Sequence, residues 1–485
     1  MSSVRRSLAY TFAESYLGIS LQIVSTLFLA RLLTPEETGI WAVATVFAAV
    51  AATLHDFGAQ EYLIQVRELT PAKIRAAMAT NLLMSWTLAV LMIVSSGFVA
   101  EFYREPGVAA GMRVQAINFL LIPFGAPAFA YYRRHLNYRP FFIASTISST
   151  TSFVVAVTCA WAGLGYMSMA WSSLAGVIVS VLVATLMRPP DMPRMPSFRG
   201  AREVWDFGKH VTGIYTLGQI GKAAPELIIG RVLGMAPTAF FTRANGMTEL
   251  FYRSVVRVAL PVCLPYFAAE ARRGAEVRAG FLRAINLLTV LAWPFFLFLA
   301  LMAFPAIRIL YGTQWLESVP LARLLCVVGA IEIVFFLAKD ALIANDHVRK
   351  GSFLQTLVQV ARVLGLVAGI PFGLLGICWG LIAGALIGAI CSHVVLHQST
   401  GLTLAQLVHA CLPSAVIALL SAAPAVVWVA FGSIDEQHFV APFVACGASG
   451  TLVWLLALRA MNHPLWREIA NVGARVAARR ARGAE

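Results

Sequence analysis

Long apolar stretches constrain the fold of this chain more than any motif does. About fourteen of them are present, near residues 9–31, 38–58, 76–99, 110–131, 140–161, 165–187, 207–230, 237–262, 279–303, 319–342, 352–371, 374–397, 404–431 and 438–459. A helix needs about 20 apolar residues to cross the hydrocarbon of a bilayer, and these stretches reach that length. Only 12% of the 485 residues are charged, against about a quarter in typical soluble domains. The sequence therefore predicts an all-α polytopic membrane protein with about fourteen transmembrane helices.

The motifs of soluble catalysis are missing from the sequence. It contains no Walker A loop, no GxSxG elbow and no HExxH helix, and it has no sizeable extramembrane region to carry a pair of catalytic carboxylates. The 7 cysteines stand singly within apolar stretches, without a CxxC pair or a histidine at ligand spacing, so we interpret them as packing residues. We therefore expect no enzyme activity, no cofactor and no metal.

The basic residues indicate membrane topology rather than a nucleic-acid partner, although the formal net charge is +14. Lys and Arg accumulate in short cytoplasmic loops. With the N-terminus inside, the cytoplasmic loops contain Arg67, Lys73, Arg75, Arg133, Arg134, Arg139, Arg188, Arg194, Arg199, Arg202, Arg272, Arg273, Arg278, Arg349 and Lys350. The opposite loops contain only Arg31, Arg104, Arg231 and Arg308. This asymmetry predicts that both termini are cytoplasmic.

One internal segment and the C-terminal tail differ in composition from the apolar stretches. The segment RPPDMPRMPSFRGARE is rich in proline and arginine, so it favours extended, water-exposed chain and divides the protein in half. The tail has an apolar stripe bordered by arginines, typical of a helix on an anionic membrane surface, although a frayed soluble tail fits equally well. The predicted parts are a six-helix lobe (1–187), a linker (188–205), a second six-helix lobe (206–398), two additional helices (399–460) and a basic amphipathic tail (461–485).

The second half repeats features of the first. At an offset of about 200 residues, Gly18, Arg31, Leu33 and Thr38 match Gly218, Arg231, Leu233 and Thr238, and the string NLL at 81–83 recurs at 286–288. At a slightly larger offset, Arg113, Arg139 and Thr146 match Arg323, Arg349 and Thr356. An ordered series of this kind is expected from a duplicated six-helix unit. Because six is even, both copies enter from the same side, which predicts two parallel six-helix repeats that face a shared cavity and rock between two states.

Ionisable residues within membrane spans are costly and commonly face a cavity or a partner. In the seventh span, Tyr215, Gln219, Lys222 and Glu226 fall within about 60° of arc on a helix. Pro225 lies in the same stripe and is expected to kink the helix. We predict that this stripe lines the cavity.

The eighth span adds a cationic face. Arg243, Glu249, Arg253 and Arg257 fall within about 120° of one another, with Asn245 just beyond the edge. The eleventh span contributes Arg362, aligned with Gln355 and Gln359. Guanidinium groups bind phosphate through paired, charge-assisted hydrogen bonds, so these arginines predict an anionic substrate such as a phosphate or pyrophosphate ester.

A structural interpretation of the same charges stays open. Lys222 with Glu226, and Glu249 with Arg253, are spaced as intrahelical ion pairs. In the tenth span, Glu332 and Lys339 are positioned to neutralise each other, and Arg257 is near enough to the cytoplasmic end to snorkel to the headgroups.

The first half offers two acidic candidates for coupling transport to a proton or cation. Glu14 shares a stripe with Gly18, Gln22 and Ser25, and Asp56 follows His55 at the end of the second span. A carboxylate in a low dielectric can titrate near neutral pH. The alternative is that His55 and Asp56 are ordinary interfacial residues. The small polar run at 145–152 fits either close helix packing or a wet lumen.

The opening LQIVSTLFLARLLTPEETGIWAVATVFAAVAATLHDFGAQEYLIQ and its later echo IIGRVLGMAPTAFFTRANGM resemble polysaccharide transporters of the oligosaccharide flippase type. These belong to the multidrug/oligosaccharidyl-lipid/polysaccharide exporter superfamily. The resemblance implies two six-helix lobes in a bacterial inner membrane. It also implies translocation of an undecaprenyl-pyrophosphate-linked oligosaccharide from the cytoplasmic to the periplasmic leaflet, for exopolysaccharide, capsule or O-antigen synthesis.

We therefore expect a flippase whose partners are a lipid-linked glycan, membrane lipids and, in the cell, a polysaccharide polymerase with its assembly proteins. Two alternatives are a drug/cation antiporter of the same superfamily, which would need a net acidic cavity, and a membrane-embedded glycan transferase, which would need a long periplasmic loop. Neither feature is evident in the sequence.

Overall fold

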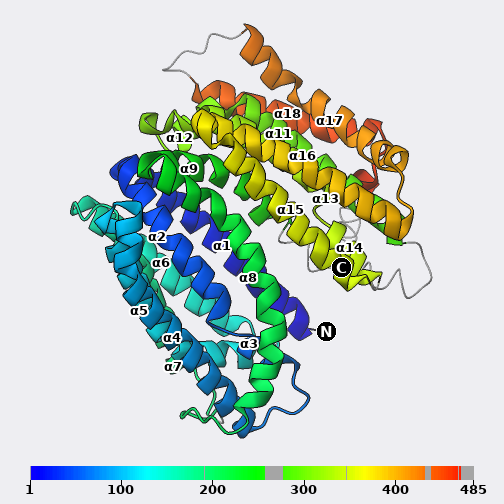
Figure 1. Ribbon diagram of the computed structural model, residues 1–485. Coiled ribbons are helices and arrows are strands. Elements are labelled where there is room, and N and C mark those ends of the chain that lie inside the picture. Colours follow the sequence, from blue (N-terminus) through cyan, green and yellow to red (C-terminus); the bar gives the residue numbers. More distant parts are fainter. Residues whose placement is uncertain are drawn as a thin grey trace, which may run out of the picture. The chain divides into compact units, whose positions relative to one another are not determined.

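The computed structural model describes residues 2–190, 192–256, 277–345, 347–431, 439–467 and 469–470, and every described segment of regular structure is helical (Figure 1). The chain forms two compact units. The first unit comprises Met1–Ala239 with Leu310–Gln314, and the second comprises Phe240–Ile309 with Trp315–Glu485. Each unit is described below by itself.

The first unit contains eight helices among its described residues and the start of a ninth. They are α1 (Ser2–Leu32), α2 (Pro35–Leu54), α3 (Ala59–Gln65), α4 (Pro71–Tyr103), α5 (Pro106–Arg134), α6 (Arg139–Trp161), α7 (Met167–Leu186), α8 (Ala201–Val232) and the first residues of α9 (Met235–Phe251). Within this unit α8 packs against α2, α3 and α4. The seventh span predicted from the sequence thus lies with the helices of the N-terminal half.

The second unit contains the rest of α9 and the helices that follow. They are the π turn η1 (Tyr252–Val256), α11 (Val277–Leu301), α12 (Ala303–Leu310), η2 (Thr313–Trp315), α13 (Ser318–Phe335), α14 (Ala338–Ala344), α15 (Val348–Gly369), η3 (Ile370–Phe372), α16 (Gly373–Thr400), α17 (Leu404–Phe431) and α18 (Val440–Ala460). The last residue of α12 and the first two residues of η2 fall in the short segment that belongs to the first unit.

Ten helical segments among the described residues are long and apolar enough to cross a membrane. Large apolar side chains cover their outer faces, and Phe98, Trp161 and Leu186 are each about three-quarters or more exposed. An apolar surface of this extent requires lipid rather than water. The prediction of an all-α polytopic membrane protein is confirmed, with at least ten spans.

The turn between α1 and α2 shows how local sequence starts a helix. The Thr34 hydroxyl accepts a hydrogen bond from the backbone N–H of Glu37, whose carboxylate accepts the N–H of Thr34, and Pro35 occupies the first helical position. Such a capping box satisfies N–H groups that have no partner within the helix. The end of α1 and the start of α2 recur 200 residues later, where α8 ends at Val232 and α9 begins at Met235.

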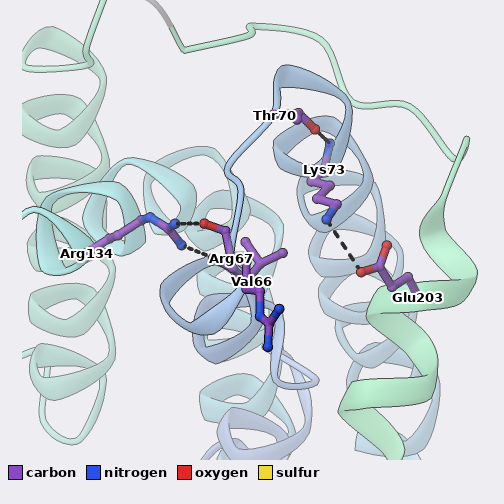
Figure 2. Close-up of polar contacts among 6 residues, drawn as sticks. All are labelled: Val66, Arg67, Thr70, Lys73, Arg134 and Glu203. Atoms are coloured by element: carbon purple, nitrogen blue, oxygen red, sulfur yellow. Dashed lines mark hydrogen bonds and ion pairs between the residues drawn. The ribbon is translucent and has the colours of Figure 1, made fainter.

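Polar contacts fasten one end of the first unit, where α3 ends (Figure 2). The guanidinium of Arg134 donates to the carbonyl oxygens of Leu63, Ile64 and Val66 at 2.9, 3.2 and 2.7 Å, and to that of Arg67 at 3.1 Å. The last carbonyls of a helix have no partner within it, and a cation near them is favourable. Arg134 therefore acts as a cap that joins α5 to the end of α3.

Part of the proline-rich linker is held against this unit. Arg188 donates to the carbonyl of Pro193, Ser197 N–H donates to the carbonyl of Arg75 at 3.1 Å, and Met192 is buried. The irregular chain ends at Ala201, where α8 begins inside the predicted linker, and Lys73 of α4 pairs with Glu203 of α8 at 3.8 Å. Most of the linker is exposed as expected, but its centre is anchored.

The two additional helices, α17 and α18, dock on α11 through polar contacts. Asn286 donates to the carbonyl of Ala410 at 2.7 Å, and Thr289 donates to the Ser414 hydroxyl at 2.9 Å. The indole of Trp454 donates to the carbonyl of Val290 at 3.0 Å. Since lipid tails are as apolar as leucine, such hydrogen bonds help helices associate in a membrane. Leu465 and Trp466 of the tail pack on the same apolar cluster, while residues 471–485 lie outside the described residues.

Candidate substrate-binding residues

The polar stripe of the seventh span lies on α8, in the first unit. Gln219 and Glu226 are half-buried and Lys222 is exposed, whereas the side chain of Tyr215 lies outside the described residues. The helix α8 is continuous through Pro225, so this proline does not end it. The stripe therefore keeps the single-helix geometry that its spacing predicts.

Close contacts hold α8 and the start of α9 against α2 and α4. A Cβ on Gly39 would overlap with the carbonyl of Met235, and one on Gly230 would lie 2.8 Å from the Val43 side chain. The Tyr103 hydroxyl donates to the carbonyl of Leu227 at 3.0 Å. Small residues let helix backbones approach closely in membranes, which positions the stripe firmly.

Arg243 of α9 stacks on an aromatic ring that sequence spacing did not reveal. Its guanidinium carbon lies 4.8 Å from the ring centroid of Trp315, which is fully buried in η2. The hydroxyl of Ser318, at the start of α13, donates to the carbonyl of Phe240 at 2.9 Å and holds this turn against α9. A desolvated cation–π contact contributes about 2 kcal/mol and fixes the plane of the guanidinium. No short-range pattern could have predicted this contact, because 72 residues separate the partners.

The helical face predicted for the eighth span is interrupted. The carbonyl of Asn245 accepts a hydrogen bond from the Thr248 hydroxyl at 2.8 Å, and Glu249 is half-buried. After Phe251 the helix changes to the π turn that contains Arg253, and Arg257 lies outside the described residues. A π turn rotates the following side chains relative to an α-helix, so the spacing of 100° per residue fails there. Such turns are frequent at functional sites.

Arg362 of α15 forms an ion pair with Glu332 of α13. Its Nη1 lies 3.3 Å from the carboxylate Oε1. Spacing in the sequence instead predicted Lys339 as the partner of Glu332. That pairing assumed one continuous helix, but α13 ends at Phe335 and α14 begins at Ala338. Seven residues also span about 10.5 Å along a helix, too far for direct contact without long side chains.

Tyr252 in the π turn is a polar residue near this pair that the sequence analysis did not single out. Its hydroxyl lies within electrostatic range of Glu332, Arg362 and Glu249. Its ring packs against Phe296 and Phe336 at centroid distances of 6.2 and 5.7 Å. The signal that could have indicated it is a tyrosine one residue before Arg253 on a helix otherwise rich in apolar residues.

The two acidic candidates of the first half have identifiable neighbours in the first unit. Glu14 is half-buried beside Ser145 and Arg133. Asp56 accepts a hydrogen bond from the backbone N–H of Gln60 at 3.2 Å and another from the side-chain amide of Asn81 at 3.1 Å.

Asp56 marks a break in the second span. The chain leaves α2 through Phe57 and Gly58, which have φ angles of 44° and 67° in the left-handed region, and continues as α3. Left-handed backbone is easy only for glycine, and the Asp56 carboxylate satisfies an N–H at the start of the new helix. Asp56 therefore has a structural role here, beside any role in coupling.

The polar run at 145–152 takes part in helix packing and also borders an open hollow. Thr146, Thr150 and Thr151 line a shallow hollow of about 360 Å³ on α6. The Ser152 hydroxyl donates to the carbonyl of Ser172 on α7 at 3.0 Å, which is helix packing.

The candidate residues divide between the units. Tyr215, Gln219, Lys222, Glu226, Glu14 and Asp56 belong to the first unit, and Arg243, Asn245, Glu249, Arg253, Arg257 and Arg362 to the second. Within the second unit, the structure brings together Glu249, Arg362 and the additional residues Tyr252 and Glu332.

Comparisons with known proteins agree with this architecture. A family model described as polysaccharide biosynthesis protein matches residues 28–320. Lipopolysaccharide biosynthesis protein WzxC of Escherichia coli K12 is 21% identical, over 78% of this chain and 77% of its own. Teichuronic acid biosynthesis protein TuaB of Bacillus subtilis is 22% identical over 74% and 75%. Succinoglycan biosynthesis transport protein ExoT of Rhizobium meliloti is 25% identical over 67% and 65%.

Two kinds of solved structure share the fold. Lipid II flippase MurJ in an inward closed conformation matches with a TM-score of 0.73 and 12% identity, over 94% of this chain and 99% of that one. An inward-facing multidrug resistance MATE transporter of the MOP superfamily matches with a TM-score of 0.60 and 17% identity, over 80% and 93%. The chain has a membrane fold like those of MurJ and MATE transporters, and because the family model covers more than half of its residues, it belongs to the polysaccharide biosynthesis protein family.

Proposed function

We propose that this protein is a flippase that moves an undecaprenyl-pyrophosphate-linked oligosaccharide from the cytoplasmic to the periplasmic leaflet of a bacterial inner membrane. The product would serve the synthesis of an exopolysaccharide, a capsule or an O-antigen, together with a polymerase and assembly proteins. The observation that carries the proposal is the fold that 94% of the chain shares with a lipid II flippase. The match of the family model to polysaccharide biosynthesis proteins supports a glycan cargo.

The proposed architecture has about fourteen spans, arranged as two parallel six-helix repeats and two additional helices. The recurrence of the α1–α2 boundary 200 residues later, at α8–α9, supports the duplication. The excess of basic residues in alternate loops supports cytoplasmic termini. In this arrangement the two repeats rock about a central site, while the lipid tail of the cargo stays in the bilayer.

The proposed substrate contacts are the cationic and polar residues Lys222, Arg243, Arg253, Arg257, Arg362, Gln219, Tyr215 and Asn245. Arg243 has the best-supported role, because stacking on Trp315 orients a planar guanidinium that can pair with phosphate oxygens through two hydrogen bonds. The four acidic candidates, Glu14, Asp56, Glu226 and Glu249, are proposed to form ion pairs or to couple transport to a cation.

Leaflet accessibility in proteoliposomes tests the proposal. Vesicles containing a lipid-linked oligosaccharide are exposed to an impermeant glycan-modifying reagent, with and without the protein. We expect modification of the inner-leaflet pool only when the protein is present. If a well-folded protein moves none of several such glycans but moves a cationic drug, the flippase proposal is refuted and the drug/cation antiporter is favoured.

Arginine variants test the site. Arg243→Ala and Arg253→Ala should abolish movement without loss of folding, and Arg243→Lys should retain part of it because a charge remains but the planar fork is lost. Arg308→Ala is a matched control, since Arg308 stacks on Phe439 at 4.8 Å in the same unit but is not a proposed contact. Normal movement by both Arg243→Ala and Arg253→Ala would remove these residues from the site.

A further inference from the structure

The ion pair between Arg362 and Glu332 lies inside the second unit, between two apolar helices. Arg362 is 21% exposed and Glu332 is 29% exposed, so both charges are largely removed from water. Both helices are long and apolar enough to span the membrane. Burying such a charge pair costs free energy and adds little to stability. Charges within membrane spans are commonly functional, so we favour a functional role for this pair.

The hydrogen-bonding capacity around the pair is incompletely used. The Nε of Arg362, the hydroxyl of Tyr252 and the Oε1 of Gln359 are buried polar atoms with no hydrogen-bond partner among the described residues. Gln359 precedes Arg362 by three residues on α15, so the two share a face of the helix. Since nearly all buried polar atoms in proteins are hydrogen-bonded, three such atoms beside an ion pair indicate a place for a polar ligand.

The hydrogen-bond donors of Arg362 and Tyr252 indicate that this ligand is an anion. Arg362 presents a planar fork of five N–H donors, of which only Nη1 contacts Glu332. Tyr252 and the guanidinium both donate, and an anion with several oxygens, such as a phosphate, can accept from both. The carboxylate of Glu332 and a phosphate would then compete for the same guanidinium.

We infer that the Glu332–Arg362 pair is an exchange site, in which a phosphate group of the cargo takes Arg362 from Glu332 and Glu332 takes up a proton. This inference rests on the proposed function and adds to it a coupled proton. The charges balance: the phosphate replaces the carboxylate as the anion beside Arg362, and the proton neutralises the carboxylate left behind. One anionic group and one proton therefore enter together, and a carboxylate without its partner in a low dielectric favours the protonated form.

Arg362 of α15 contacts Glu332, and Tyr252 of the π turn lies within electrostatic range of Glu332, Arg362 and Glu249. The other helices packed on α13 carry their charged and histidine residues near their ends. These are Arg278 and Arg283 in α11, and His393 and His397 in α16.

Calorimetry on the full-length protein in detergent micelles tests the exchange, with undecaprenyl pyrophosphate as the probe. Titrations at pH 7.5 in two buffers of different ionisation enthalpy count the protons taken up for each lipid bound. We expect wild-type protein to take up close to one proton. Glu332→Gln should bind at least as tightly and lose that uptake, and Arg362→Gln should bind at least tenfold more weakly. Glu317→Gln, at the exposed start of the same helix, is the control and should behave as wild type.

Three results would overturn the inference: no proton uptake by wild-type protein, unchanged uptake by Glu332→Gln, or a loss of affinity in Glu332→Gln as large as in Arg362→Gln. If either single variant fails to fold, the double variant Glu332→Gln/Arg362→Gln leaves no unpaired charge and should bind weakly without proton uptake. Movement between leaflets without proton uptake would refute the exchange alone. Proton-linked binding without movement would refute the flippase and retain the exchange site.

Discussion

Alanine in place of Gly380 should open the contact between α15 and α16, the helix pair that positions Arg362. The two backbones touch where Gly365 and Gly369 of α15 face Gly376 and Gly380 of α16. A Cβ on Gly380 would lie 2.7 Å from the carbonyl carbon of Gly365 and closer still to its oxygen. The obstacle is backbone on both sides, so no side chain can rotate away.

The size of the effect follows from this geometry. Carbon atoms in contact prefer about 3.5–4.0 Å, so the helices must separate by roughly 1 Å. A gap of that size forfeits about a quarter to a half of each local dispersion contact, and overpacked positions in well-packed cores cost about 1–3 kcal/mol. We therefore expect the overlap to lower the free energy of unfolding by about 2 kcal/mol, or the midpoint by about 4–8 °C for a unit of this size, relative to a glycine-to-alanine change that gains the same helix propensity without the overlap.

Thermal unfolding in detergent micelles, followed by size-exclusion chromatography of the purified protein, measures the change. Gly388→Ala is the matched control on the same helix, because its Cβ would meet only the Val358 side chain at an ordinary 3.4 Å. Both variants gain the same helix propensity, about 1 kcal/mol, so their difference isolates the contact. If Gly380→Ala unfolds at the same temperature as Gly388→Ala, the close approach of the two backbones is refuted.

Hydrogen exchange tests two further features of the structure, the Arg134 cap and the docking of the tail beside His463. Arg134→Ala removes a cap from four carbonyls and should increase the hydrogen exchange of residues 59–67 by about tenfold or more. Arg133→Ala keeps the cap and loses a stacking contact with a ring 5.0 Å away and a charge near Glu14 and Glu61, so it should increase the exchange much less; equal exchange in both variants would contradict the cap. Burial lowers the pKa of His463 below its usual 6.5, and its Nδ1 accepts the N–H of Leu465 at 3.2 Å, so the neutral ring favours the docked tail. This stabilisation is complete above pH 6.5 and is lost as the pH falls through the folded-state pKa. Hydrogen exchange of residues 465–467, corrected for the intrinsic rate, should therefore rise from pH 7.5 to pH 5 in wild type, and a response that persists in His463→Asn would exclude this histidine as the cause.

The membrane character of the chain could be predicted because it depends on local composition. Apolar runs of about 20 residues have one stable environment, whichever neighbours they acquire. The capping box at Thr34 and Glu37 and its position before an apolar run were likewise readable from a few adjacent letters. For the same reason, the boundary between the seventh and eighth spans was placed within a few residues of Val232 and Met235.

The partners of the charged side chains could not be predicted in the same way. Spacing along one helix offered Lys339 to Glu332, whereas the partner is Arg362, thirty residues away on another helix. Arg243 rests on Trp315, and the helix that carries Arg253 changes pitch before reaching it. These contacts depend on which helices pack together and on how far each is shifted along the other. The spacing of residues along a single helix does not contain that information.

The sequence by itself determined that this chain lies in a membrane as a bundle of helices, that its halves share a pattern, and that several of its spans carry charged residues. Each of these follows from the transfer of residues between water and lipid, which acts on every segment independently. Tertiary structure alone decided that α8 packs with α2 and α4, that α17 and α18 dock on α11, and which carboxylate accompanies which arginine. The reason is physical: an ion pair or a backbone contact needs atoms within a few ångströms, and only packing brings distant residues that close.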